Sequence, residues 1–149
     1  MNLKEWLTRH LGGHREAEAD PAHGLKLAVA ALLVEVLRAD YDVGSEERQQ
    51  VVASTSRVLG LTAEEGAALV AEAERHIDRS HDLYQFTSQV NRAYGDAEKA
   101  QLLEALWRVA QADATVHKYE EHLIRRIADL LHMPHSSFIT AKLRAAASS

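Results

Sequence analysis

The fold is decided by two stretches of one pattern, LVEVLRADYDVGSEERQQV at residues 33–51 and LWRVAQADATVHKYEEHLI at residues 106–124. In both, apolar residues recur at spacings of three and four on either side of a short polar turn, which is the periodicity of amphipathic helices. An Ala-Asp pair closes the first helix of each stretch, and a Glu stands near the start of the second. The pattern therefore predicts two copies of a helix pair joined by an acidic turn.

The two stretches correspond at one constant offset, which pairs Asp40 with Asp113 and Glu47 with Glu120. Apolar positions share this offset: Leu33 with Leu106, Val36 with Val109, Val43 with Val116 and Val51 with Ile124. We expect the register to continue without a gap to Leu59 with Leu131, Leu61 with Met133 and Thr62 with Pro134. Each three-helix unit alone would leave an apolar face bare, so the two units should pack as a pseudo-twofold bundle.

Helical periodicity covers the rest of the chain, and no stretch alternates in the manner of a strand. The predicted helices are 2–11, 25–39, 45–59, 63–77, 83–94, 97–112, 118–131 and 134–146. Gly60 is expected to end one helix, Asp96 to cap another, and Thr62 with Glu65 to form a capping box. The fold class is therefore all-α, a compact bundle of seven to eight helices.

The chain divides into two parts on this pattern. Residues 1–24 are predicted to be an N-terminal amphipathic helix with a polar linker, and residues 25–149 the helical domain, with units at about 25–78 and 97–147. Trp6 on the N-terminal helix could dock on a membrane surface or a partner, but packing on the chain's own core is favoured. Trp107 is expected in the core.

Composition narrows the function classes. The 149 residues are 46% apolar and carry a formal net charge of −5, which argues against the basic face that nucleic-acid binding requires. The absence of cysteine excludes disulfides, thiolate metal sites and a cysteine nucleophile. No apolar run reaches the roughly 18 residues that span a bilayer, and residues 1–11 lack a signal-peptide core. We expect a cytoplasmic protein, with peripheral membrane association at most.

The pattern Ala-Asp-x-x-Val-x-x-x-Glu, present at Ala39 to Glu47 and again at Ala112 to Glu120, resembles the TerB-like family of tellurite-resistance proteins and DjlA N-terminal-like domains. The resemblance covers about residues 25–143. The family pattern has Gly after the Asp, where this chain has Tyr41 and Ala114. The resemblance implies an all-α fold, an association with tellurite resistance or stress response, a suspected acidic metal site, and no enzymatic activity.

The acidic turns have two interpretations. Asp40, Glu47, Asp113 and Glu120, with Asp42 as a fifth, could converge across the pseudo-twofold axis and bind a divalent cation such as Ca²⁺ or Mg²⁺, which prefers oxygen ligands. Alternatively, each residue only caps a helix or a turn, a role worth roughly 0.3–1 kcal/mol near a helix N-terminus. The twelve-residue spacing of an EF-hand is absent.

Other chemistry has less support. The nine histidines make no His-Glu-x-x-His motif: His117 and His122 are five apart, His132 and His135 flank Pro134, and Gly12-Gly13 separates His10 from His14. Asp78, Ser80 and His81 are neighbours in the sequence, but residues 79–82 are typical of a loop that caps the next helix, so no catalytic residues are assigned. The alternative function is a helical scaffold that binds a protein partner without metal. The oligomeric state is not determined by the sequence.

Overall fold

The computed structural model describes residues 21–39, 45–79, 82–111 and 118–147. Every regular element in these ranges is an α-helix, which confirms the predicted fold class. The helices are α3 (Pro21–Arg38), α4 (Ser45–Leu59), α5 (Ala63–Arg79), α6 (Leu83–Ala93), α7 (Asp96–Gln111), α8 (Lys118–Leu130) and α9 (His135–Ala147). The predicted N-terminal helix 2–11, Trp6, the linker before residue 21 and both acidic turns lie outside the described residues.

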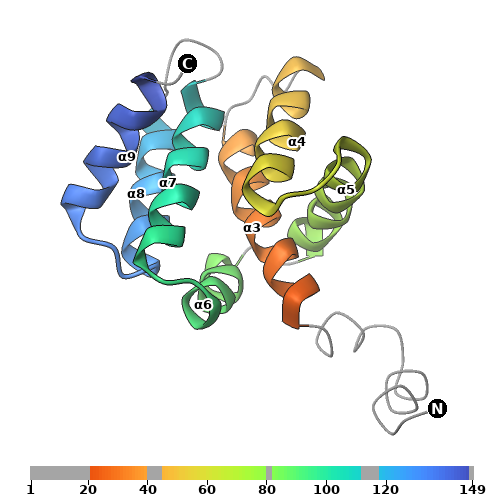
Figure 1. The fold of residues 1–149 in the computed structure, drawn as a ribbon, viewed down its shortest axis with the longest axis horizontal. Coiled ribbons are helices and arrows are strands. Elements are labelled where there is room, and N and C mark those ends of the chain that lie inside the picture. Colours follow the sequence, from red (N-terminus) through yellow and green to blue (C-terminus); the bar gives the residue numbers. More distant parts are fainter. Residues whose placement is uncertain (1–20, 40–44, 80–81, 112–117, 148–149) are drawn as a thin grey trace, which may run out of the picture.

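The helices form two groups of three that pack side by side, α3–α5 and α7–α9, with α6 between them in the chain (Figure 1). The long central helices of the two groups, α3 and α7, contact each other, and each also packs against the other helices of its own group. This arrangement is the predicted pair of three-helix units. Within the described ranges, none of the helices combines the length and the apolar character needed to cross a membrane.

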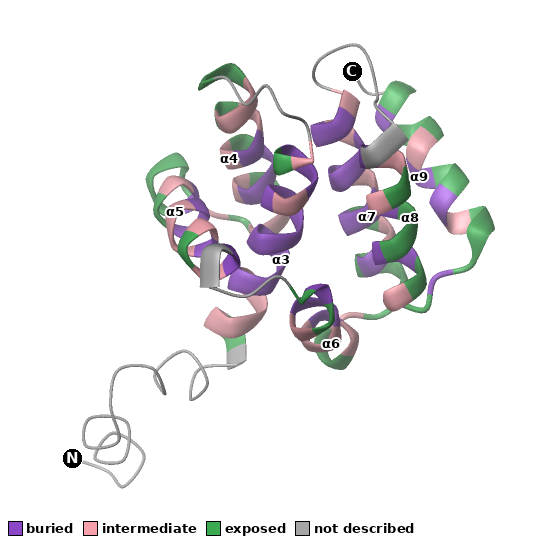
Figure 2. Cartoon of the chain, turned by 180° about the vertical axis from the view of Figure 1, so that it is seen from behind, coloured by how far each residue is buried: buried purple, intermediate pink, exposed green. Residues whose placement is uncertain are grey.

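Helix α3 is the centre of the core. Every residue from Leu27 to Val34 is buried, and Figure 2 shows this helix between α4 and α5 on one side and α7 and α8 on the other. A helix that is apolar on all sides is stable only when neighbours cover every face, and α4, α5, α6, α7 and α8 do so here. Trp107 of α7 is also fully buried, as the sequence predicted.

Most helix ends follow the sequence prediction to within two residues. The largest difference is at α3, which begins at Pro21 and not at residue 25, because proline is well suited to the first turn of a helix. The prediction that Asp96 caps α7 is wrong, since Asp96 is the first residue of that helix. The backbone N–H of Gly95 instead donates to Glu98 Oε1 at 2.9 Å.

The duplication is visible in how α4 and α8 end. Gly60 follows α4 with φ of 67°, and His132 follows α8 with φ of 59°. The next residue in each unit donates its N–H to the carbonyl five positions earlier, Leu61 to Ser56 at 2.8 Å and Met133 to Ala128 at 3.0 Å. Gly60 and His132 are 72 positions apart, as are Leu59 and Leu131, whereas Asp40 and Asp113 are 73 apart, so the expectation of a gap-free register is wrong. The second unit has lost one residue between Ile124 and His132.

Candidate acidic site at one end of the bundle

The helix ends that flank the two acidic turns lie at one end of the molecule. Helices α3 and α7 finish there and α4 and α8 begin there, at the top of Figure 1. Helix α4 also contacts α7, and α3 contacts α8, so the two units pack against each other through these helices as well. Three of the predicted ligands, Asp40, Asp42 and Asp113, fall outside the described residues. Glu47 and Glu120 are described.

Four helices share one local feature, a glutamate as their third residue: Glu47 in α4, Glu65 in α5, Glu98 in α7 and Glu120 in α8. Glu65 forms the predicted capping box, since Thr62 N–H donates to Glu65 Oε1 at 2.9 Å and Glu65 N–H donates to Thr62 Oγ1 at 3.1 Å. Hydrogen bonds to the carboxylate from the backbone N–H of Thr62 and, second, from its side chain lower the pKa of Glu65. Glu98 bonds the N–H of Gly95 in the same way. Both capping glutamates are exposed to solvent.

Glu120 has a different environment, although its local position is the same. It is buried, with 3% of its surface exposed, and its counterpart Glu47 is half-buried. Both residues have interaction partners, so a capping role fits each of them. Removing a carboxylate from water still costs several kcal/mol unless its surroundings compensate. Glu65 and Glu98 are therefore exposed capping residues, whereas Glu47 and Glu120 are withdrawn from solvent. The latter two lie at the end of the bundle next to the acidic turns, here called the acidic end.

The described ranges contain no group of three or more His, Cys, Asp or Glu side chains that could hold a metal ion. Glu47 and Glu120 therefore do not make a complete site by themselves. The predicted convergence of four carboxylates depends on Asp40 and Asp113, beyond the part of the chain that the structure describes.

The described histidines have ordinary surroundings. His122, His132 and His135 are exposed, and the ring of His135 stacks on Phe138 with the centroids 5.5 Å apart. His23 Nε2 lies 3.1 Å from Glu72 Oε2 and links α3 to α5. His10, His14, His81 and His117 lie outside the described residues, as does Ser80. No described histidine belongs to a candidate metal group.

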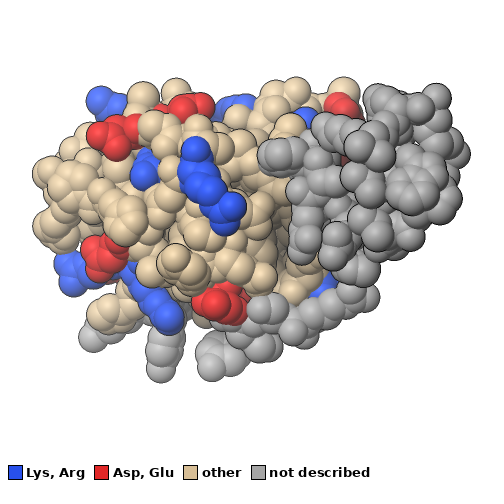
Figure 3. All heavy atoms as spheres, turned by 90° about the horizontal axis from the view of Figure 1, so that it is seen from below, with Lys and Arg blue, Asp and Glu red and all other residues tan. Residues whose placement is uncertain are grey.

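Surface charges pair locally. Arg48 Nη2 lies 2.8 Å from Glu74 Oε1 and joins α4 to α5, while Arg108 and Glu104 pair along α7 at the same distance. On the face shown in Figure 3, acidic and basic side chains are interspersed with uncharged ones. Ion pairs that remain partly open to solvent contribute little to stability, with a typical value of about 0–1 kcal/mol. This face has the mixed charge of a solvated surface.

Sequence analysis missed the residues that close the other end of α8. Lys99 is buried, and its Nζ donates to the carbonyl of Leu131 at 2.9 Å. Asn91 Nδ2 donates to the carbonyl of Leu130, also at 2.9 Å. The available signal was the position of Lys99, four residues before Leu103 and so on the apolar stripe of α7. Cationic side chains near a helix C-terminus interact favourably with its free carbonyls.

Comparison with known proteins gives a significant match to a family model. No curated protein and no solved structure matches the chain significantly. The family model for the tellurite resistance protein TerB matches residues 26–143, a range that includes every described helix at least in part. Because this match covers well over half of the chain and agrees with the observed all-α fold, the chain belongs to the TerB family.

Proposed function

We propose that this chain is a non-catalytic module of tellurite resistance or a related stress response, and that the acidic end of its bundle binds a divalent cation such as Ca²⁺ or Mg²⁺. The observation that carries the proposal is the burial of Glu120 in the first turn of α8. Helix capping alone does not require such burial, because Glu65 and Glu98 cap their helices while exposed.

A cation accounts for features that capping leaves unexplained. Carboxylates held close together repel one another, and a bound cation removes that repulsion. The duplication supplies half-buried Glu47 in the matching turn and brings the flanking helix ends to the same end of the bundle (Figure 1). Oxygen-only ligands favour Ca²⁺ or Mg²⁺ over softer metals, and Ca²⁺ accepts the more irregular geometry of the two. Asp40, Asp42 and Asp113 are the further ligands proposed.

The second candidate is a helical scaffold that binds a protein partner and no metal. It is favoured by the exposure of two large apolar side chains of α9, Ile139 at 37% and Leu143 at 64%. Under this candidate the acidic residues of both turns act only as caps. The cation titration that follows discriminates between the two.

The experiment is thermal unfolding of the full chain, first with a chelator and then with Ca²⁺, Mg²⁺, Mn²⁺ or Zn²⁺ added singly. A ligand that binds only the native state adds about 2.7 kcal/mol at 100 times its Kd. In a domain of this size that corresponds to a rise in Tm of roughly 5–10 °C. We expect Ca²⁺ or Mg²⁺ to raise the Tm of the wild type.

Two matched variants locate the site. Glu120→Gln should remove the cation-dependent rise, whereas Glu98→Gln, which alters an exposed cap at the same helix position, should keep it. Absence of a rise with any of the four cations would overturn the proposal. Equal loss in both variants would show that the ions act on overall charge and not on a site at the acidic end.

A further inference from the structure

The two three-helix units differ at one pair of equivalent positions. In the first unit, Gly66 lets α5 lie close to α4, since a Cβ there would run into Ser56 Oγ and come within 3.2 Å of the Val52 carbonyl. In the register that pairs Gly60 with His132, the matching position of the second unit is Phe138. Helices α8 and α9 accordingly touch much less than α4 and α5 do. A bulky ring thus separates two helices that a glycine brings together in the first unit.

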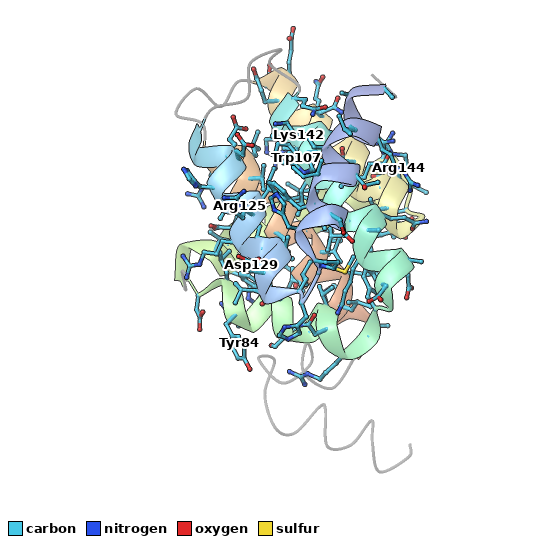
Figure 4. All side chains as sticks on the ribbon, turned by 90° about the vertical axis from the view of Figure 1, so that its left-hand side faces the viewer. Tyr84, Trp107, Arg125, Asp129, Lys142 and Arg144 are labelled. Atoms are coloured by element: carbon cyan, nitrogen blue, oxygen red, sulfur yellow. The ribbon has the colours of Figure 1, made fainter. Side chains whose placement is uncertain are left out.

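The region where α8 and α9 meet, here called the α8–α9 seam, has buried aromatic rings beneath a layer of cationic side chains. Trp107 of α7 and Phe138 form its floor, with ring centroids 5.1 Å apart. Lys142 Nζ lies 5.2 Å from the Trp107 centroid, and the Arg125 guanidinium lies 5.6 Å from that of Phe138. Figure 4 shows Trp107 between the two helices, with Arg125 on α8. Lys142 also pairs with Glu121 across the seam at 3.3 Å.

An exposed apolar stripe of α9 borders the seam. Ile139 and Leu143 are one helical turn apart, so they lie on one face, and Lys142 is three residues from Ile139 on the seam side. Leu143 has 64% of its surface exposed. The inner face of α9 is formed by Phe138, Ala141 and Ala145, which are buried. Ile139 and Leu143 therefore lie outside the hydrophobic core.

The charge of this region is opposite to that of the whole chain. Residues 118–147 contain five basic and three acidic side chains, while the full chain contains 17 basic and 22 acidic ones. Arg125, Arg126 and Arg144 are exposed. Figure 4 shows Arg125 and Arg144 on opposite sides of α9, with Asp129 near Arg125 on α8. Arg125, Lys142 and Arg144 outnumber Glu121 and Asp129 in this region, so its net charge is positive. An apolar stripe within a net positive surface is complementary to an acidic ligand that has one apolar face.

We propose that the α8–α9 seam and the stripe of Ile139 and Leu143 form a docking surface for an acidic amphipathic helix of a partner protein. The apolar side chains of that helix pack on Ile139 and Leu143, and its carboxylates meet Arg125 on one margin and Arg144 on the other. Recognition by residues spaced as i, i+3, i+4 and i+7 is the usual mode for a helix that binds along such a surface. The interaction is independent of the cation proposed above.

The test uses a fluorescein-labelled helical peptide of about 18 residues, with Leu at the i, i+3, i+4 and i+7 spacing and Glu on both margins. A second peptide keeps the Leu residues and replaces every Glu with Lys. Binding to the full chain is followed by fluorescence anisotropy in the presence of a chelator, at low and at physiological salt. The indole N–H signal of Trp107, assigned against Trp6→Phe, reports on the seam by NMR.

The control variant replaces a side chain that is as exposed as Leu143. Leu143→Ser and Arg125→Glu alter the docking surface, and Tyr84→Ser is the control, because Tyr84 is also 64% exposed but lies on α6. We expect the Glu peptide to bind, the Lys peptide not to bind, and salt to weaken the complex. Each surface variant should weaken binding by about tenfold or more, and Tyr84→Ser should leave it unchanged.

Three outcomes would overturn the proposal. The first is that the Glu peptide does not bind, and the second is that it binds equally to wild type, Leu143→Ser and Arg125→Glu. The third is concentration-dependent self-association, measured by light scattering, that Leu143→Ser abolishes, which would assign the surface to a second copy of the chain. Because a chelator is present throughout, none of these outcomes bears on the cation proposal.

Discussion

His132 adopts the left-handed conformation that Gly60, its counterpart in the first unit, adopts, with φ of 59° against 67°. Both residues end a helix, and both are followed by a residue that bonds back five positions. The geometry of the turn is thus retained in the two units, while only one of them has the residue that adopts it without strain.

We expect His132→Gly to stabilise the chain by about 0.5–1 kcal/mol. The left-handed region costs a non-glycine residue roughly 1–2 kcal/mol, and part of that gain is offset by the greater freedom of glycine in the unfolded chain. Gly60→Ala should cost about 1 kcal/mol through backbone strain alone, because no atom lies within 4 Å of the added Cβ. Urea unfolding measures both, and a destabilised His132→Gly variant would contradict the argument.

Acidification should remove the contribution of Glu65. Hydrogen bonds from Thr62 lower the pKa of Glu65 in the folded state, so its stabilisation is present in full above the unfolded pKa of about 4.3. It is lost as the pH falls through the lower folded pKa. The stability difference between wild type and Glu65→Gln, measured by urea unfolding between pH 7 and pH 3, should therefore shrink at the acidic end. A difference that grows on acidification would show the opposite linkage.

Gly66→Ala should destabilise the chain by about 1–3 kcal/mol, the usual cost of adding a methyl group to a close-packed contact. The new Cβ would meet the side chain of Ser56 and the backbone of Val52. The same change should cost less in a Ser56→Ala background, because the nearest obstructing atom is then absent. A double-mutant cycle by urea unfolding measures this coupling, and strict additivity would argue against close contact of α4 and α5 at this point.

Lys99→Met should destabilise the chain by about 1–2 kcal/mol. The substitution keeps the apolar stem but leaves the buried Leu131 carbonyl without its charged donor, and such hydrogen bonds contribute roughly 1.5–3 kcal/mol. Relief from burying the ammonium group offsets part of the loss. Thermal and urea unfolding measure the effect. An unchanged or higher stability would mean that desolvation outweighs the hydrogen bond.

The double substitution Asp40→Ala with Asp113→Ala separates the two interpretations of the acidic turns. If the turns hold a cation, the variant should lose the rise in Tm that Ca²⁺ or Mg²⁺ gives the wild type. If they only cap helices, it should be modestly destabilised, by about 0.5–2 kcal/mol for each cap, and equally with or without the ion. Calorimetry in chelator and in each cation distinguishes the two patterns.

Local signals made the helices predictable. Helix α4 has the predicted bounds Ser45–Leu59, Gly60 ends it, and Thr62 with Glu65 begins the next helix as a capping box. Asp82 caps α6 as predicted, accepting from Tyr84 N–H at 3.0 Å. Each of these features depends on residues within about five positions of one another, so the sequence contains the whole interaction. The TerB resemblance, read from the duplicated acidic turn, is confirmed by the family match.

Local sequence signals did not predict which charged side chains are buried. Glu65, Glu98 and Glu120 are the same residue at the same helix position, yet the first two are exposed and the third is buried. Lys99 lies on an apolar stripe, but its role depends on the far end of α8, a separate element of the chain. The proposed ligands Asp40, Asp42 and Asp113 remain a prediction from the sequence.

By itself, the sequence determined that this protein is all-helical, duplicated, and acidic at two matched turns, because helix period and caps are set by neighbours along the chain. Only the tertiary structure decided which glutamate is withdrawn from water and that Phe138 separates α8 from α9 where Gly66 joins α4 to α5. Those outcomes depend on contacts between residues far apart in the chain, whose packing fixes the solvent exposure of each group.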